Sequence, residues 1–600
     1  MVMAKTRNHE ITLAWLTGKT IDASLSTTHL EAGVDLVHVS MTAPIPTMLP
    51  PCTLSWTHPI VEIHAFWRTA GDHDKSLLPE YARKLTTKAM SQAPVCCLHS
   101  FGGQNRLTFA FSDALHTLYM SAGVHEETAT LHCSIDLFVE PSPPLERYEA
   151  MLRIDTRDIP YYECLEEVQQ WWASQPGYQP ALVPETARLP MYSTWYSFHQ
   201  LVAAAQVEEQ CRLAKELGCE AIIVDDGWQT SGVARDYAYT GDWEVAAEKI
   251  PDMKTHVARV HELGMKYLLW YAVPFVGIHS KAYARFADKI LETIDTFGAG
   301  VLDPRFPDVR EYIISTYEQA MRAWDLDGFK LDFIDSFAAP SQVEQELSAR
   351  QDYLSVPEAV DRLLADLLAR LKAIKPNVVI EFRQSYIGPR MRKYANMFRA
   401  ADCPNDALTN RIRTLDLRLL CGESAVHSDM LMWHKDEPVE SAALQIVNIL
   451  FAVPQISVLL DTLPPQHLTM IRYWLAFWRN HRDVLLDGEL AALHPETHYP
   501  VVLATTPEKR VVVMYQDTVV NPGLHLPGTL VVVNGTLERS MVLEFAEDAG
   551  IRQLTICDCQ GQVCRQERVH ISKGLLRIEV PTAGVVTLVT DGPARDADLA

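Results

Sequence analysis

Hydrophobic and polar positions follow two different rhythms along this chain. Over residues 11–139, and again after Asp487, apolar residues come in short alternating runs such as 107–111 and 511–515. Such alternation is typical of half-buried β-strands. Between these regions, strand-length apolar segments alternate with helix-length amphipathic ones, as in a parallel sheet with crossover helices. The pattern predicts a β-sandwich at each end of the chain and an α/β domain in the middle.

The middle region supplies enough segments for a barrel. Its eight candidate strands are residues 191–195, 221–224, 266–270, 328–333, 378–382, 396–402, 425–430 and 456–460. Between the first two, Val207, Cys211 and Ala214 share one face of a predicted helix. Gly218 is placed to end that helix. We therefore predict an α/β fold, a (β/α)8 barrel flanked by N-terminal and C-terminal β-sandwich domains.

Three domains are expected, because 600 residues exceed what one hydrophobic core usually supports. Residues 1–187 form a β-rich domain that ends in a helical linker, and a polar, proline-containing segment at 180–190 marks its boundary. Residues 188–487 form the barrel. Residues 488–600 form the second sandwich, because the alternating runs return after Asp487 and Gly488.

The composition and charge of the chain limit the partners, the location and the metal sites that we expect for this protein. The net charge of -23 repels nucleic acid and anionic membranes, so neither is expected as a partner. Neither a signal-length apolar segment at the start nor a membrane-length apolar run occurs, and a cytoplasmic protein is expected. The twelve cysteines have no small-domain disulfide spacing and are interpreted as reduced thiols. Cys557, Cys559 and Cys564 are a disfavoured metal alternative, and we expect neither metal nor cofactor.

The carboxyl ends of the predicted strands carry the candidate chemistry, because barrel active sites lie at that face. The residues there are Trp195, Asp225, Asp226, Trp228, Trp270, Lys330, Asp332, Arg383, Arg399, Asp402, His427 and Asp429. Carboxylates and cations can hold sugar hydroxyls while indoles cover the C–H faces of a sugar. Helix caps and core packing could explain any one of these residues. A whole ring of them favours a carbohydrate site.

Cleaving a glycosidic bond takes two carboxyl groups, and two aspartates fit best. Asp332 lies near the end of the fourth strand, and the alternation places Lys330 on the same side. A nearby ammonium would keep Asp332 ionised, as a nucleophile requires. Asp402 lies two strands further round and could face it across a bound sugar. Asp429 is an alternative acid, and Asp406 is expected at the start of the next helix.

Several motifs carry a specific resemblance. They are Val-Asp-Asp-Gly-Trp at 224–228, Gly-Asp-Trp at 241–243, His-Glu-Leu-Gly-Met-Lys-Tyr-Leu-Leu-Trp at 261–270, Lys-Leu-Asp at 330–332 and Ala-Asp at 401–402. Together they resemble glycoside hydrolase family 36, the melibiase or α-galactosidase family, over about residues 190–487. The resemblance implies a hydrolase of carbohydrate metabolism that releases terminal α-linked galactose from oligosaccharides or glycoconjugates. It implies no cofactor.

Site roles follow from the resemblance residue by residue. It implies that Asp332 is the nucleophile and Asp402 the acid/base, in a double displacement with retention. Asp225 and Asp226 would bind the 4- and 6-hydroxyls, and Lys330 would line the pocket. The remaining candidates for substrate contact are Trp195, Trp228, Trp270, Arg383, Arg399 and His427.

Departures from the family pattern keep alternatives open. Leu331 replaces a Trp, Ile334 an Asn, and Ala-Val-Pro-Phe at 272–275 the family's Glu-Pro-x-Met block. Arg-Gln-Ser-Tyr-Ile-Gly at 383–388 replaces the Cys-x-Ser-Gly-Gly segment that meets the 2-position of the sugar. An α-N-acetylgalactosaminidase and an α-galactosyl transferase are alternatives on the same scaffold. A noncatalytic carbohydrate-binding barrel is an alternative of another class, and a homo-oligomer is left open.

Overall fold

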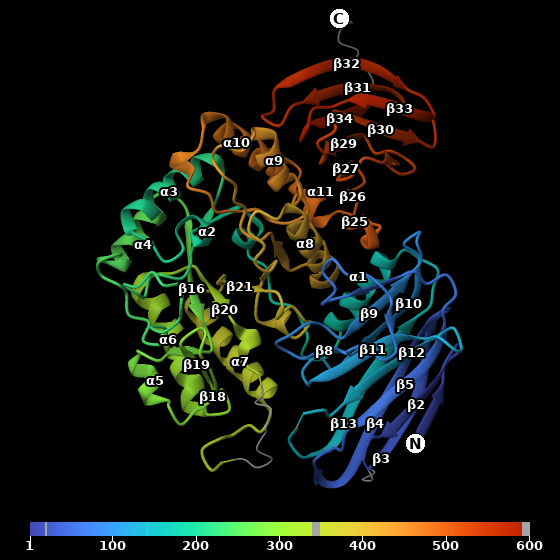
Figure 1. Ribbon diagram of the computed structural model, residues 1–600, viewed down its shortest axis with the longest axis vertical. Coiled ribbons are helices and arrows are strands. Elements are labelled where there is room, and N and C mark those ends of the chain that lie inside the picture. Colours follow the sequence, from blue (N-terminus) through green and yellow to red (C-terminus); the bar gives the residue numbers. More distant parts are fainter. Residues whose placement is uncertain (18–20, 141, 339–347, 591–600) are drawn as a thin grey trace, which may run out of the picture.

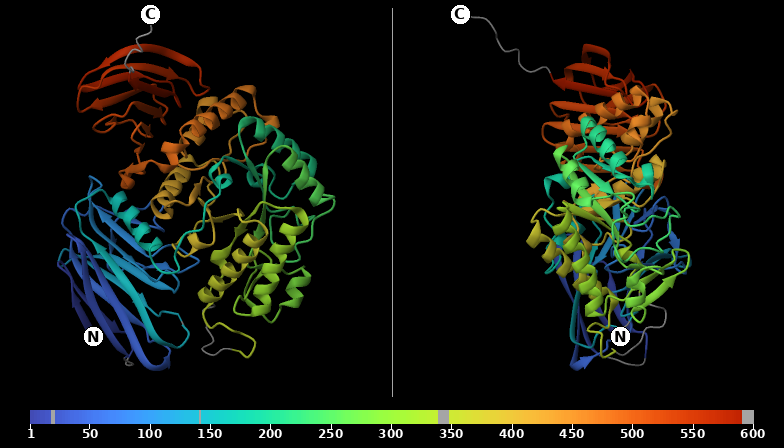
Figure 2. Two further views of the ribbon diagram at one scale, coloured as in Figure 1. Left: turned by 180° about the vertical axis from the view of Figure 1, so that it is seen from behind. Right: turned by 90° about the vertical axis from the view of Figure 1, so that its left-hand side faces the viewer.

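The computed structural model describes residues 1–17, 21–140, 142–338 and 348–590. Residues 591–600 of the expected C-terminal range therefore lie outside the described residues. Figure 1 shows two sheet-rich regions with the barrel beside them. The C-terminal sheets, in red, lie at the top of the view, and the N-terminal sandwich, in blue, lies below them. The views in Figure 2 show the same arrangement from behind and from the side. The predicted fold class is confirmed.

Two sheets form the N-terminal sandwich, and their strands pair antiparallel except for the parallel pair of β7 and β11. The first contains, in spatial order, β1 (Val2–Lys5), β2 (Glu10–Trp15), β5 (Cys52–Pro59), β12 (Thr130–Leu137), β11 (Leu118–His125) and β7 (Leu78–Pro79), with β8 (Leu85–Thr87) also paired to β11. The second contains β3 (Asp22–Glu31), β4 (Val34–Thr47), β13 (Leu145–Asp155), β10 (Asn105–Phe111), β9 (Val95–His99) and β6 (Ala65–Arg68). Alternate residues such as Leu54 and Trp56 face inward, and the two inner faces share one buried apolar core.

Helix α1 (Tyr161–Ala173) joins the sandwich to the rest of the molecule. Figure 1 shows it at the end of the sandwich that faces α8 and β25. The buried Trp172 indole donates to the Phe111 carbonyl at 2.9 Å, and the Tyr161 hydroxyl donates to the Ala492 carbonyl at 2.6 Å. One helix therefore bonds to both the N-terminal and the C-terminal sheets.

A buried carboxylate makes a second junction. Asp416 accepts hydrogen bonds from the Trp67 indole at 2.9 Å, the Lys75 ammonium at 2.7 Å and the Tyr499 hydroxyl at 2.5 Å. Trp67 belongs to the N-terminal sandwich, Asp416 to helix α8 (Ala407–Cys421) of the barrel, and Tyr499 to the C-terminal segment. Lys75 and Asp416 are both buried, so three parts of the chain meet at one ion pair that is shielded from water.

Eight parallel strands form the barrel. In spatial order they are β23 (Ala425–His427), β22 (Met397–Arg399), β21 (Val379–Arg383), β20 (Gly328–Asp332), β16 (Lys266–Ala272), β15 (Ala221–Val224), β14 (Met191–Ser193) and β24 (Gln455–Ile456). Parallel bridges from His427 to Val453 and from Leu431 to Ile456 bring the two end strands together. The expected strands are present, but the sixth ends at Arg399, and Trp195 begins a helix instead of ending the first strand.

Helices alternate with the strands along the barrel region. They are α2 (Trp195–Phe198), α3 (Ala204–Leu217), α4 (Met253–Glu262), α5 (Lys281–Arg285), α6 (Pro307–Trp324), α7 (Val356–Ile374), α8, α9 (Val439–Val447), α10 (Pro465–Asn480) and α11 (Arg482–Asp487). Helix α3 buries Val207, Cys211 and Ala214 as expected. Gly218 ends α3 with φ +113°, a conformation that side chains with a Cβ rarely adopt.

A small antiparallel sheet between β16 and α6 was not predicted from the sequence. It contains β17 (Phe275–Gly277), β19 (Ala299–Leu302) and β18 (Ile290–Ile294). No residue of its outer strand β18 is buried, so this strand lacks the apolar alternation that marks a half-buried strand.

The C-terminal region again has two sheets. The larger contains β25 (Glu489–Leu493), β26 (Val501–Thr505), β27 (Lys509–Met514), β29 (Thr529–Asn534), β34 (Val585–Thr590), β31 (Gly550–Cys557) and β32 (Val563–Ile571). The smaller contains β28 (Val519–Val520), β30 (Ser540–Phe545) and β33 (Gly574–Glu579). A buried core that includes Val512, Val532 and Leu588 lies between them. In the part of the chain that the structure describes, no helix is long and apolar enough to cross a membrane.

Candidate active site

Asp332 is the most tightly held carboxylate at the strand ends. It ends β20, and its oxygens accept hydrogen bonds from the Arg383 guanidinium at 2.7 Å, the Trp270 indole at 3.0 Å and the Phe333 amide at 2.8 Å. Burial acts to raise the pKa of Asp332, but the charges of Arg383 and Lys330 reverse this and hold that pKa well below its usual range. Asp332 is therefore a fixed anion, which suits a nucleophile.

Lys330 and Asp225 form a buried ion pair beside Asp332. The Lys330 ammonium lies 2.5 Å from an Asp225 oxygen, and both side chains are buried. Burial lowers the pKa of Lys330, but the Asp225 charge outweighs it and the pKa is raised. Register explains the contact, because alternation along β20 turns Lys330 and Asp332 to the same side, toward the barrel axis. Lys330 and Asp332 therefore lie on one face of β20, as expected.

Asp226 lies in a different environment from its neighbour. Its two oxygens accept hydrogen bonds from the Gln200 and Gln229 amides, at 2.7 and 2.6 Å. Burial raises the pKa of Asp226 to about 6, although both hydrogen bonds act to lower it. Gly227 has φ +114°, and a Cβ there would lie 2.5 Å from the Gln200 Cα. Only glycine lets the chain turn this closely against Gln200.

Arg399 organises the opposite side of the site. Its guanidinium lies 3.0 Å from Asp402, 2.6 Å from Asp429 and 3.4 Å from Glu381. Asp429 is fully buried and also accepts from the Tyr196 hydroxyl and the Cys403 amide, at 2.9 and 2.6 Å. Every oxygen of Asp429 is thus engaged by the protein. Asp429, the alternative acid, acts here as an anchor for Arg399 and the loop after β22.

Asp402 is the carboxylate that remains accessible. It lies three residues beyond β22, and its side chain is 51% exposed. Burial acts to raise the pKa of Asp402, whereas the Arg399 and Lys330 charges lower it below its usual value. The Asp332 charge acts on Asp402 in the raising direction. The two carboxylates therefore belong to one electrostatic site, with one fixed and one open to solvent.

Aromatic rings cover the carboxylates. Trp270 stacks on Tyr237 with ring centroids 6.0 Å apart and an interplanar angle of 26°. Burial and the charge of Asp332 both raise the pKa of Tyr237, so this phenol faces the carboxylates. Trp195 is half-buried and packs edge-on against His199, with centroids 4.5 Å apart. These rings provide the aromatic wall that a sugar site needs.

Two of the predicted substrate contacts lie elsewhere. The fully buried Trp228 packs against Tyr271, Trp243 and Trp324 in an aromatic cluster, and its indole donates to the Trp270 carbonyl at 3.0 Å. His427 is buried deeper in the barrel and bonds to the Ala187 carbonyl at 2.7 Å. Burial lowers the pKa of His427 to about 4, so the imidazole is neutral. Both residues are packing elements beneath or behind the site.

Comparison with known proteins agrees with this geometry. The Melibiase family model matches residues 187–410. An α-galactosidase from Pediococcus pentosaceus is 27% identical over 213 residues, which cover 33% of this chain and 28% of that protein. The α-galactosidase AgaA from Geobacillus stearothermophilus is 29% identical over 171 residues, covering 26% of this chain and 23% of AgaA. The chain thus matches about a quarter of the length of these curated relatives.

Solved structures extend the likeness of the fold beyond the barrel. The crystal structure of an α-galactosidase from Lactobacillus brevis superimposes with a TM-score of 0.65 at 15% identity, covering 98% of this chain and 86% of that one. A family 36 AgaA variant from Geobacillus stearothermophilus, in complex with raffinose, gives a TM-score of 0.62 at 15% identity, with coverage of 97% and 81%. Residues 187–410 are thus similar to the Melibiase family, and the fold of the chain as a whole is similar to that of these α-galactosidases.

Arg383 contacts several residues around Asp332. Its guanidinium bonds to Asp332, lies 3.4 Å from an Asp335 oxygen and packs over the Phe333 ring at 5.3 Å. Asp335 also accepts from the Ser385 hydroxyl at 3.2 Å. The segment at 383–388, whose sequence departs from the family pattern, therefore contacts the proposed nucleophile directly.

Several residues of the candidate site were not predicted from the sequence. They are Gln200, Gln229, Tyr237, Asp335 and Glu381. Most come from loops, where no periodicity indicates which way a side chain points. Of these residues, only Glu381 could have been predicted from the sequence, because alternation along β21 places it on the same side as Arg383.

Proposed function

We propose that this chain is a retaining α-galactosidase in which Asp332 is the nucleophile and Asp402 the acid/base. The observation that carries the proposal is the contrast between the two carboxylates. Asp332 is buried and held as an anion by Arg383 and Lys330, while Asp402 is half-exposed and can meet a leaving group. A glycosidase that works by double displacement needs one carboxyl group of each kind.

In the first step, an Asp332 oxygen attacks the anomeric carbon. The bond from that carbon to the glycosidic oxygen breaks, and Asp402 gives its proton to the departing oxygen. A bound sugar covers Asp402 and removes water from it, which raises its pKa toward the protonated form that this step needs. The product is an ester between the sugar and Asp332.

In the second step, esterified Asp332 no longer carries a charge. Because the Asp332 charge acts to raise the pKa of Asp402, its loss lowers that pKa and favours the carboxylate. Asp402 then takes a proton from water, the water oxygen attacks the anomeric carbon, and the bond to Asp332 breaks. Two inversions leave the anomeric configuration unchanged.

A galactose ring is the proposed substrate unit. Asp225 and Asp226 are the proposed acceptors for its 4- and 6-hydroxyls, and Trp270 and Tyr237 form the wall beside them. The relatives named as α-galactosidases, and the AgaA variants solved with raffinose and stachyose, support oligosaccharides with terminal α-galactose as substrates. A site that uses carboxylates to read an axial hydroxyl rejects the equatorial epimer strongly.

A panel of 4-nitrophenyl α-glycosides tests the proposal. We expect kcat/KM to be highest for the galactoside and lower for the α-glucoside and the 2-acetamido-galactoside. A clear preference for the acetamido sugar would replace galactose by N-acetylgalactosamine, and a preference for the glucoside would remove the proposed role of Asp225 and Asp226. Proton NMR of the first product should show the α anomer.

We also propose a cytoplasmic location. All twelve cysteines lie in the described residues and are free thiols, and most of them are buried. A reducing compartment keeps such thiols intact. Fractionation of the source cells would test the location.

A further inference from the structure

A second cluster of potential ligands lies on the N-terminal sandwich, outside the barrel. Glu80, His125 and His132 each offer one ligand atom, and these atoms all lie within 4.8 Å of one another. Glu80 follows β7, His125 ends β11 and His132 lies in β12. Among the residues that the structure describes, this is the one group of three or more histidine, cysteine or acidic side chains close enough to share a metal ion.

Strand register brings the two histidines together. Across the β11–β12 pair, His132 lies opposite Gly123 and His125 lies opposite Thr130, so the imidazoles are two positions apart on one face of the sheet. Their rings stack with centroids 4.3 Å apart and an interplanar angle of 18°. The His125 Nδ1 lies 2.8 Å from the Thr128 hydroxyl, which orients the ring, and its Nε2 lies 3.5 Å from an oxygen of the exposed Glu127 carboxylate.

The absence of a side chain at Gly123 allows the third potential ligand, Glu80, to lie close to β11. Strand β7 pairs with the other edge of β11, and the Glu80 amide donates to the Val124 carbonyl at 3.1 Å. A Cβ on Gly123 would lie 2.3 Å from the Glu80 Cα, so any other residue would push Glu80 away. With glycine there, the Glu80 carboxylate reaches across β11 to lie 2.8 Å from the His132 Nδ1.

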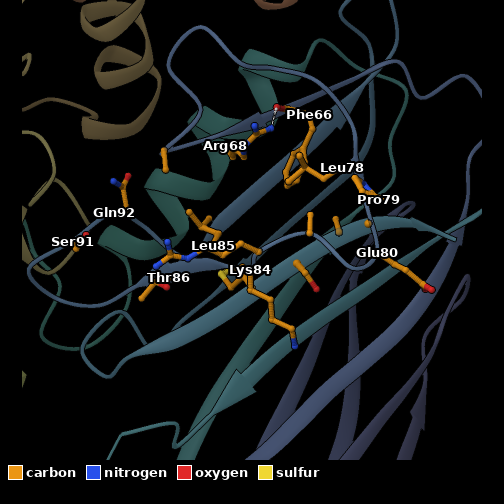
Figure 3. A pocket seen from close by; sticks show the side chains of 17 residues that line it. Phe66, Arg68, Leu78, Pro79, Glu80, Lys84, Leu85, Thr86, Ser91 and Gln92 are labelled. Carbon is orange, nitrogen blue, oxygen red and sulfur yellow. Dashed lines mark hydrogen bonds between the residues drawn. The ribbon is translucent and has the colours of Figure 1, made fainter. Parts of the chain in front are cut away.

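The surroundings leave room for water but keep the ligands ordered. The side chains of His125, His132 and Glu80 are 23%, 41% and 39% exposed. Glu80 also lies at the rim of a cavity of about 370 Å³ in the sandwich. Figure 3 shows its carboxylate extending away from the labelled side chains of Phe66 and Leu85. The cluster therefore faces solvent beside the cavity and does not fill it.

We propose that Glu80, His125 and His132 bind one zinc ion. Two imidazoles and one carboxylate are a ligand set that Zn²⁺ prefers, and water can complete the four ligands. Ligand atoms about 2.1 Å from zinc lie about 3.4 Å apart in a tetrahedron, so small side-chain rotations close the gap from 4.8 Å. The ion would fasten the two-residue edge strand β7 to the β11–β12 hairpin. It has no role in the barrel chemistry.

Zinc titration of the full chain by calorimetry tests the proposal. The titration uses a Cys564→Ser background, because Cys564 is an exposed thiol that can bind zinc by itself. We expect one zinc per chain, and binding at least about tenfold weaker in His132→Gln and in Glu80→Gln. The matched control is His434→Gln, an exposed histidine beside Asp436 that belongs to no such cluster. It should bind zinc like the parent protein.

Hydrogen exchange gives a second readout that does not depend on enzyme activity. Zinc should slow exchange of the Glu80 amide, which bonds to Val124, in the parent protein but not in His132→Gln. Unchanged glycosidase activity of His132→Gln shows that the variant is folded. Parent-like zinc affinity in both His132→Gln and Glu80→Gln, or zinc that leaves the Glu80 amide unprotected, would overturn the site.

Discussion

Protonation of Asp226 should control sugar binding near pH 6. Its pKa of about 6 lies above the usual 3.8, which corresponds to about 3 kcal/mol against the ionised form. Below pH 6 the carboxyl is neutral and accepts hydrogen bonds poorly. The ionised form that accepts the sugar hydroxyls appears as the pH rises. At pH 5 about one tenth of Asp226 is ionised, so kcat/KM should be about tenfold below its plateau above pH 7.

The assay is kcat/KM for 4-nitrophenyl α-galactoside between pH 4.5 and 8. Nitrophenol departs without needing a proton, so the titration of Asp402 does not enter this measurement. In Asp226→Asn the activity should fall overall, by about 5- to 150-fold for a lost buried acceptor. The remaining activity should no longer depend on pH around 6.

A neighbouring variant provides the matched control. The charge of Asp225 helps to raise the pKa of Asp226, so Asp225→Asn should move the rise in kcat/KM to lower pH without removing it. A rise centred near pH 6 that persists in Asp226→Asn would refute the reasoning. So would a parent enzyme whose kcat/KM is constant between pH 5 and 7.

Three further variants separate the carboxylates of the other half of the site. Asp332→Ala should lower turnover by about 10⁴-fold or more, and azide should restore part of it by attacking from the vacated side, as product analysis would show. Asp402→Asn should slow cleavage of substrates with poor leaving groups by about 10² to 10⁴-fold and of nitrophenyl substrates much less; equal losses for both would exclude an acid role. Asp429→Asn should lower the free energy of unfolding by about 3 to 5 kcal/mol, seen in thermal unfolding, because it breaks a buried ion pair with Arg399. If Asp429→Asn showed the leaving-group pattern instead, the acid would lie on the seventh strand.

The barrel and its two flanking sandwiches could be predicted from periodicity. Some barrel strands, such as β15, are apolar runs that stop at a polar residue, and β20 can be recognised by its alternation. Its alternation alone places Lys330 and Asp332 on one side, where the structure has both of them buried and their charges interacting. Short exposed strands such as β18 carry no such signal.

The sequence could not predict how deeply each strand-end side chain lies within the site. A residue at a strand end can face the substrate, the layer below or the helices outside, and only three-dimensional packing decides between them. His427 points down to the Ala187 carbonyl, and Trp228 turns outward after Gly227. Loop residues were missed for the same reason. Gln200 reaches Asp226 because Gly227 permits a close approach, which no spacing in the sequence reveals.

The junction at Asp416 makes the acid/base loop dependent on the far end of the molecule. Helix α8, which carries Asp416, begins just after the loop that holds Asp402, and Asp406 caps its first turn. Replacing Lys75 alone, as in Lys75→Met, would leave Asp416 buried against Trp67 without its cation, a loss of about 3 to 5 kcal/mol. Contacts from the sandwich therefore help to hold helix α8, and with it the loop that carries the proposed proton donor Asp402.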